Sequence, residues 1–128
     1  MGNYTVAVID FETTGLSPRE GDRTIEVGAV LVSENQIVDR FQSLMNPQQR
    51  ISRFIEEYTG ITNHMLNKAP EISTVMKQLR RFISDHHLVA HNAQFDSRFL
   101  DAELARMSSK RSNQFACTML TSRRVYKQ

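Results

Sequence analysis

Stretches of apolar and β-branched residues alternate with polar turns along the first part of the chain. Residues 4–10 are apolar without polar alternation, a pattern typical of a central strand covered on both faces. After the turn-forming residues 13–18, a β-branched pattern returns over 24–32 and again over 37–45. Because only a short polar segment, Glu34-Asn35-Gln36, separates the last two stretches, they are predicted to form an antiparallel hairpin.

After Asn46-Pro47 the apolar period changes from that of a strand to that of a helix. Apolar residues recur at i, i+3, i+4, i+7, i+10 and i+11 from Ile72 to Ile83, which predicts an amphipathic helix with one core-facing stripe. Pro70 and Glu71 are expected in its first turn, where a missing N–H is harmless and a negative charge suits the helix dipole.

A second strand-to-helix change follows in the last third of the chain. Residues 87–91 are predicted to form a fourth, short strand, and residues 93–107 a second helix. Residues 115–120 are predicted as one more strand edge that leads into a terminal helix. The sequence therefore predicts an α/β fold, with an antiparallel hairpin next to parallel strands, and ligand groups are expected beyond the carboxyl ends of the strands.

Length and composition narrow the class of protein. With 128 residues, 40% hydrophobic and 23% charged, the chain is expected to form one globular domain, which excludes disordered and collagen-like classes. A lone cysteine, Cys117, excludes an internal disulfide framework and fits a reducing compartment. Because no apolar run approaches the ~20 residues that cross a bilayer, we expect a soluble, cytoplasmic protein with no membrane partner.

The net charge of +2 conceals an uneven distribution. Residues 1–39 hold seven acids and two bases, whereas no acid follows Glu103. This basic end can track a phosphate backbone, or it can be a solvated surface segment, and the sequence leaves both readings open. Its bases are Arg106, Lys110, Arg111, Arg123, Arg124 and Lys127.

Two carboxylates follow the first predicted strand directly. If the strand continues, Asp10 and Glu12 leave the same face with Cα atoms ~6.7 Å apart, and their charges repel by about 2.5 kcal/mol at a dielectric near 20. Arg19 is the first basic residue after them. A divalent cation can offset the repulsion, and Asp96, in the first turn of the second predicted helix, can join the site. Alternatively, Asp10 merely ends a strand and Asp96 caps a helix.

Three converging carboxylates would suit metal-assisted phosphoryl hydrolysis, in which one ion generates hydroxide and a pair clamps the attacking and leaving oxygens. Two other functions fit the same residues. Asp10 could be the nucleophile of a phosphatase, although Glu12 stands where a second Asp would be usual. The basic end could also make the chain a non-catalytic module that binds nucleic acid or a protein partner.

Several segments together match one family. Residues 8–16 read Val-Ile-Asp-Phe-Glu-Thr-Thr-Gly-Leu, and residues 88–96 read Leu-Val-Ala-His-Asn-Ala-Gln-Phe-Asp. They resemble the first and second motifs of the DEDDh exonucleases, which include the proofreading epsilon subunit of bacterial DNA polymerase III and ribonuclease T. Asn46-Pro47, Thr59-Gly60-Ile61-Thr62 and Ala69-Pro70 stand in the family's order between them, so the resemblance runs from about Val6 to Arg124.

The resemblance implies a ribonuclease H-like mixed sheet with flanking helices. It also implies an enzyme that releases nucleoside monophosphates from the 3′ ends of single-stranded DNA or RNA, with a DNA polymerase as a partner in some relatives. Asp10, Glu12 and Asp96 would hold two divalent cations, Mg²⁺ or Mn²⁺, with Asp10 shared between them.

The resemblance also implies which residues contact substrate. Thr13 would touch the terminal nucleotide, Phe95 would shape its pocket, and Tyr58 and Thr59 would line that pocket. Some relatives have His where this chain has Thr59, which puts that contact in doubt. Nothing in the sequence decides between DNA and RNA.

The family's third motif does not stand within these 128 residues. It consists of a general-base His and, five residues later, a last metal-binding Asp. His91 precedes Asp96 by five residues but belongs to the second motif, so we expect it to be a structural residue at a strand end. Residues 1–128 are therefore expected to form a single exonuclease domain that lacks its last segment and is nearly inactive alone. An apolar face left exposed would favour a homo-dimer.

Overall fold

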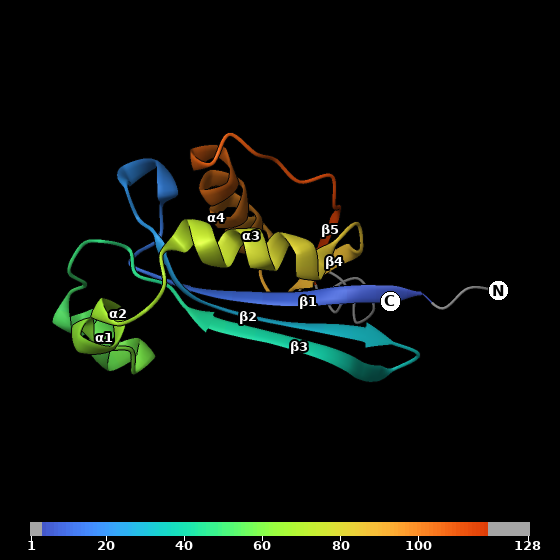
Figure 1. Ribbon diagram of the computed structural model, residues 1–128, viewed down its shortest axis with the longest axis horizontal. Helices are drawn as coiled ribbons and strands as arrows, with labels where there is room; N and C mark the ends of the chain where they lie inside the picture. Colours follow the sequence, from blue (N-terminus) through green and yellow to red (C-terminus); the bar gives the residue numbers. More distant parts are fainter. Residues whose placement is uncertain (1–3, 118–128) are drawn as a thin grey trace, which may run out of the picture.

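The computed structural model describes residues 4–117, which form a five-stranded sheet with two long helices packed on one side of it (Figure 1). The strand order is β3-β2-β1-β4-β5, with β1 antiparallel to β2, β2 antiparallel to β3, and β4 parallel to both β1 and β5. This mixed sheet confirms the predicted α/β architecture. The strands are β1 (Thr5–Thr13), β2 (Thr24–Ser33), β3 (Gln36–Leu44), β4 (His87–Ala90) and β5 (Phe115–Cys117).

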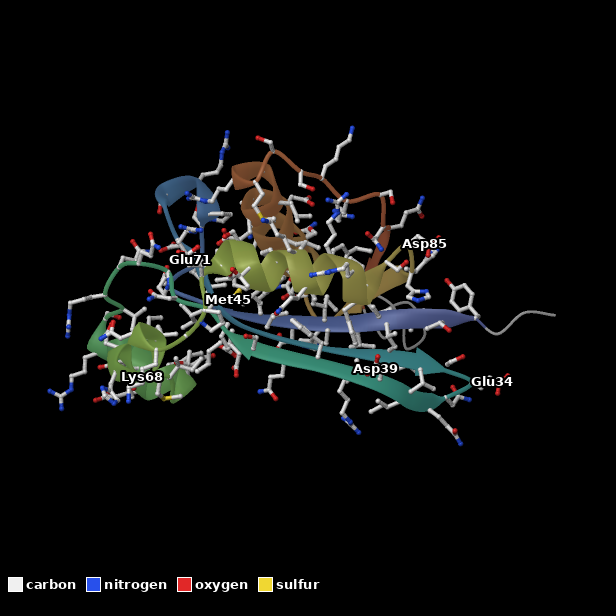
Figure 2. The ribbon with its side chains drawn as sticks, in the orientation of Figure 1. Glu34, Asp39, Met45, Lys68, Glu71 and Asp85 are labelled. Atoms are coloured by element: carbon white, nitrogen blue, oxygen red, sulfur yellow. The ribbon has the colours of Figure 1, made fainter. Side chains whose placement is uncertain are left out.

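The predicted hairpin is formed by β2 and β3. Its loop consists of Glu34 and Asn35, one residue shorter than predicted, because Gln36 already pairs with Ser33. Glu34 and Asn35 have φ of +54° and +64°, the positive values that a two-residue type I′ turn requires at both central positions. Glu34 marks this tip of the sheet in Figure 2.

The two predicted helices are present within a residue of their expected ends. α3 (Ile72–Ile83) and α4 (Ala93–Arg106) follow the apolar patterns, but Pro70 and Glu71 lie before α3 and not in its first turn. Glu71 is extended (φ −62°, ψ 149°), because the N–H of Asn46 binds the carbonyl of Pro70 and holds this segment in a β-bridge. The remaining helices are a 3₁₀ turn, η1 (Pro18–Glu20), α1 (Arg53–Thr59) and α2 (Asn63–Asn67).

Family-like residues between the two motifs have local structural roles. The hydroxyl of Ser52 accepts the N–H of Ile55 at the start of α1, and Gly60 ends that helix with φ +76°. Thr62 then caps α2 by accepting the N–H of Met65. The Thr-Gly-Ile-Thr segment is therefore the joint between two short helices.

The main core lies between the sheet and the pair α3 and α4. The apolar stripe of α3 is buried as predicted, and Phe99, Leu100 and Leu104 of α4 pack in the same cluster. A smaller cluster, made by Ile25, Ile51, Ile61 and Leu66, fixes α1 and α2 to the end of the sheet.

The expectation that β1 is covered on both faces is wrong for the described residues. Ala7, Ile9 and Phe11 are buried in the core, whereas Val8 on the other face is only half-buried and Asp10 is exposed. This difference could not be predicted from the sequence, because the open face carries valines and the buried face carries the similarly apolar alanine and isoleucine. β1 is central within the sheet but covered on one side.

Of the predicted strand edge over residues 115–120, the first three residues form β5 beside β4. Its remainder and the predicted terminal helix lie outside the described residues. None of the described helices combines the length and the apolar character needed to span a membrane.

Candidate active site

Asp96 contacts β1 at the point where β4 stops pairing with β1. The parallel ladder between the two strands ends at Val8 and Val89, which leaves the next part of β1 without a strand neighbour on that side. Asp96, in the first turn of α4, fills this place: its Oδ1 accepts the N–H of Phe11 at 3.1 Å. Because Phe11 lies between Asp10 and Glu12 in the chain, the bond brings Asp96 close to both.

Asn92 sets the start of α4 and thereby the position of Asp96. Its side-chain oxygen accepts the N–H of Phe95 at 3.4 Å, and its backbone carbonyl accepts the N–H of Asp96 at 3.1 Å. This N-cap explains in physical terms why an Asn stands between the strand and the helix. The helix N-terminus also favours a negative charge in its first turn.

The three carboxylates share one electrostatic environment. Burial, helped by the charges of Asp10 and Glu12 and opposed by the hydrogen bond from the Phe11 N–H, raises the pKa of Asp96 from its ordinary value of 3.8 to about 7. Burial also raises the pKa of Glu12, with added repulsion from Asp10 and Glu26. The edge therefore carries more negative charge than its surroundings neutralise.

His91 lies nearer to this edge than we expected. It follows β4 directly and is exposed. Desolvation raises the pKa of Asp10, and an electrostatic interaction with His91 opposes that shift. The place of His91 in the second motif predicts only a structural residue at a strand end. The parallel pairing of β4 with β1, which sequence alone did not give, is what places His91 beside Asp10.

The carboxylates of Asp10, Glu12 and Asp96 have the charge and the oxygen ligands that suit a hard divalent cation. Their side chains are not arranged as a metal site among the described residues. Between Tyr4 and Cys117, no group of three or more His, Cys, Asp or Glu side chains is arranged to hold a metal ion. Carboxylate oxygens are the ligands that Mg²⁺ and Mn²⁺ prefer. Burial is the main cause of the raised pKa of Asp96, and repulsion from Asp10 and Glu12 adds to it. A bound cation would relieve that repulsion.

A cavity of about 560 Å³ opens beside Glu12, between the end of β1, helix α1 and the start of α4. All four residues predicted to contact substrate line it: Thr13, Tyr58, Thr59 and Phe95. The structure thus brings together residues that are up to 82 positions apart in the chain, from Thr13 to Phe95.

An aromatic pair that was not predicted from the sequence lies at the mouth of the cavity. The rings of Phe54 and Tyr58 stack with centroids 5.9 Å apart and planes 13° apart, and both side chains are largely exposed, by 71% and 77%. Leu16, exposed by 80%, lines the cavity from the β1 side. The four-residue spacing of Phe54 and Tyr58 was the available signal, because residues so spaced share a helix face.

The threonine hydroxyls at the cavity are engaged in backbone turns. Thr13 donates its hydroxyl hydrogen to the carbonyl of Gly15 at 2.6 Å. The Thr59 hydroxyl donates to the Ile55 carbonyl at 2.7 Å and accepts the N–H of Ile61 at 3.1 Å. Both side chains therefore hold the walls of the cavity in shape, a role that the sequence did not reveal.

The loop after β1 is closed by Asp22. Its carboxylate accepts the hydroxyl hydrogen of Thr14 at 3.1 Å and the N–H of Ser17 at 3.0 Å. A Cβ atom on Gly15 would lie 2.6 Å from Cγ of Asp22, so the loop closes this tightly only with glycine there. This closure holds Thr13 and Leu16 at the cavity.

The sequence profile of a known family matches nearly the whole chain. The family is described as Exonuclease (RNase_T), and the match covers residues 7–128. The chain belongs to this exonuclease family. Membership confirms the resemblance to the DEDDh exonucleases, a family that uses divalent metal ions, and favours this class over a phosphatase with an aspartate nucleophile.

Bacterial DNA-processing proteins are among the relatives of this exonuclease domain. A PolC-type DNA polymerase III of Bacillus cereus is 45% identical over 113 residues, which are 88% of this chain and 8% of that protein. The 3′-5′ exonuclease DinG of Bacillus subtilis is 38% identical over 104 residues, 81% of this chain and 11% of that protein. The domain thus spans a small part of these curated relatives.

Among solved structures, the exonuclease domain resembles exonuclease X in complex with 5′-overhanging duplex DNA. The two share 29% sequence identity and superpose with a TM-score of 0.75, over 94% of this chain and 64% of that one. The likeness confirms the ribonuclease H-like mixed sheet with flanking helices.

Proposed function

We propose that this chain forms the carboxylate edge and the nucleotide cavity of a metal-dependent 3′-to-5′ exonuclease domain, which releases nucleoside monophosphates. The observation that carries the proposal is the bond between Asp96 and the N–H of Phe11. It joins α4 to β1 between Asp10 and Glu12, directly beside the cavity that Glu12 and Phe95 line.

Asp10, Glu12 and Asp96 are the residues proposed to hold two divalent cations, Mg²⁺ or Mn²⁺. Such ions supply a hydroxide nucleophile near neutral pH and neutralise charge that develops on a phosphate. Glu12 lies at the border between edge and cavity, so it can set the distance between a bound phosphate and its nucleoside. Asp96 is already fixed by Phe11, which reduces the freedom lost when it binds an ion.

The cavity is proposed to receive the 3′-terminal nucleotide, in contact with Thr13, Tyr58, Thr59 and Phe95. The stacked rings of Phe54 and Tyr58 offer an exposed aromatic platform at its mouth. Stacking of a base on such a ring contributes about 1–3 kcal/mol without regard to sequence. An exonuclease that removes nucleotides one after another needs this tolerance for every base.

We propose DNA as the substrate and a DNA polymerase as a partner, because the Bacillus cereus relative is a DNA polymerase III. The same cavity would accept a ribonucleotide unless its walls exclude the 2′-hydroxyl. Comparison of single-stranded DNA with RNA of the same sequence tests the choice of substrate, and equal rates of release would contradict it.

The 128-residue chain alone is expected to turn over slowly. A general base typically contributes about 10²- to 10⁴-fold to a rate, and no His follows His91 among these residues. With Mn²⁺ and single-stranded DNA, we expect slow release of label from the 3′ end that stops in Asp10→Ala. Brisk release would contradict the expected low activity, and shortening from the 5′ end would overturn the exonuclease assignment.

Binding of the reaction product tests the site whatever the turnover. Calorimetry should show that thymidine 5′-monophosphate binds in the presence of Mn²⁺, that binding weakens at least tenfold without the ion, and that Asp10→Ala abolishes it. Asp39→Ala, which removes an exposed carboxylate on β3, is the matched control and should bind normally. Equal binding with and without Mn²⁺, or unchanged binding in Asp10→Ala, would contradict the proposal.

A homo-dimer is also proposed, through the open face of the sheet. Val6 and Val8 of β1 pair in register with Val32 and Val30 of β2, and all four side chains are only half-buried on the face away from α3 and α4. Light scattering should give a mass above that of one chain at high concentration, and Val30→Lys should return it to one chain. A single-chain mass for the wild type would contradict this.

A further inference from the structure

A second charged surface lies on the outer side of α3. The apolar stripe of this helix faces the core, so Lys77, Arg80 and Arg81 face solvent and are exposed. The loop between α4 and β5 brings exposed Lys110 to the same place, since Lys110 and Arg80 line one hollow. Residues that are 33 positions apart, from Lys77 to Lys110, thus form one basic surface.

No ion pair offsets these four cations, because nearby acids pair with other bases. Arg23 and Arg106 pair with Glu103, and Arg111 pairs with Asp101. Within residues 4–117, Lys77, Arg80, Arg81 and Lys110 make no ion pair. Asp85, exposed just beyond the end of α3 (Figure 2), carries one negative charge against these four, which leaves a positive excess.

The basic surface is hollowed. Two adjoining hollows of about 640 and 320 Å³ share Arg80 and Ser84 as lining residues. Lys77 and Arg81 line the larger one, and Lys110 lines the smaller one. At 1.5 Å per helical residue, Lys77 to Ser84 extends for about 10 Å along the axis of α3. The cations therefore form an elongated strip.

The strip is separate from the carboxylate edge. No residue that lines the nucleotide cavity also lines either hollow. The helix layer lies on the Ala7, Ile9 and Phe11 face of β1, whereas Asp10 is exposed on the opposite face. A ligand on the strip would not touch Asp10.

We propose that this strip binds the phosphodiester backbone of a nucleic-acid strand, at a site apart from the carboxylate edge. A strand carries one negative charge about every 3.4 Å, so the ~10 Å strip spans about three phosphates. The residues that line both hollows are basic or polar apart from Met107, with no aromatic ring for a base to stack on. Binding at the strip therefore depends on the charge of the phosphates and not on the base sequence. The strip can hold a strand on the domain wherever the 3′ end of that strand lies.

The test uses a covalently closed circular single strand, which has no 3′ end, in EDTA so that no hydrolysis occurs. Fluorescence anisotropy measures its affinity as a function of salt concentration. Each phosphate contact contributes about 0.7 to the slope of log K against log salt for single strands, so Arg80→Ala/Arg81→Ala should lower the slope by about 1.4. Lys68→Ala, at an exposed cation beside α2 in Figure 2, should leave the slope unchanged.

A second double variant, Lys77→Ala/Lys110→Ala, removes cations from two different elements and should lower the slope equally. Circular dichroism confirms that each variant is folded. An unchanged slope in a folded double variant, or no binding by the wild type at low salt, overturns the proposal. Equally effective competition by polyglutamate also overturns it, in favour of an acidic protein partner. Because the circle has no 3′ end, failure here leaves the exonuclease proposal untouched.

Discussion

At the scale of single residues, Glu103 is the charged group most deeply built into the fold. Its buried carboxylate accepts two hydrogen bonds from Nε and Nη2 of Arg23 at 3.0 and 2.9 Å. It also accepts the N–H and the hydroxyl hydrogen of Thr24, each at 3.2 Å. These bonds join the start of β2 to the last turns of α4.

Glu103→Ala should therefore be strongly destabilising. It leaves Arg23 and the N–H of Thr24 without their acceptor in a buried place, at a cost of about 3 kcal/mol in the free energy of unfolding. Urea denaturation measures the loss. Asp101→Ala breaks the more exposed pair with Arg111 and is the matched control, with an expected loss of about 1 kcal/mol or less. Equal losses would contradict the role given to Glu103.

The pKa of Asp96 gives a stability that depends on pH. Because the pKa is about 7 in the folded chain and 3.8 ordinarily, the folded state binds the proton more tightly. The contribution of Asp96 to the free energy of unfolding is complete below pH 3.8, and it is lost as the pH rises through about 7. In EDTA, the wild type should lose on the order of 2 kcal/mol more than Asp96→Asn between pH 5 and 8. Parallel pH profiles in urea denaturation would contradict this.

At this scale the sequence predicted part of the site. The two-residue period of a strand placed Asp10 and Glu12 on one face, and β1 does extend through both. The bond from Phe11 to Asp96 could not be predicted, because it depends on where β4 stops pairing with β1. The position of His91 beside Asp10 has the same origin.

At the scale of elements, the loop between β1 and β2 should fail if Gly15 gains a side chain. In Gly15→Ala the new Cβ meets the Asp22 carboxylate, so that carboxylate must shift and its bonds to Thr14 and Ser17 are disturbed. We expect a loss of about 1–3 kcal/mol in the free energy of unfolding and weaker Mn²⁺-dependent binding of thymidine 5′-monophosphate. Gly28→Ala, where a Cβ meets open space, is the control and should cost little. Equal behaviour of the two variants would show that the loop is not held by this contact.

Helices and strands long enough to show a repeating pattern of apolar residues could be predicted from the sequence. The stripe of α3 fixed both ends of that helix to within a residue, because five of its twelve residues are buried. By contrast, α1 and α2 have seven and five residues, and only Leu66 among them is buried. Helices this short depend on their caps, Ser52 and Thr62, and on packing over the smaller core. Their apolar pattern alone therefore did not predict them.

At the scale of the whole molecule, the basic residues after Glu103 have different roles because they lie in different places in the fold. Arg111 is bound to Asp101 and lies over the ring of Phe115, so it is part of the scaffold. Lys110, its neighbour, instead joins the cations of α3. The sequence suggested a charged tail, whereas the described part of that tail contributes one residue to a surface built mainly on a helix.

The two surfaces on which function is proposed share no lining residue. The carboxylate edge and the cavity lie where β1 and β4 end, near α1, and the basic strip lies on the outer side of α3 (Figure 1). A strand could thus be held on the basic strip while its 3′ end reaches the cavity. Neither surface could be assembled from the sequence alone, because each joins segments that only the sheet order brings together.

The central claim is that Asp10, Glu12 and Asp96 act together on divalent cations, and Mn²⁺ binding tests it most directly. Electron paramagnetic resonance measures free Mn²⁺ during titration of the chain. We expect binding by the wild type, at least tenfold weaker binding by Asp10→Asn and by Asp96→Asn, and unchanged binding by Asp39→Asn. Equal Mn²⁺ affinity in all four proteins would contradict the account.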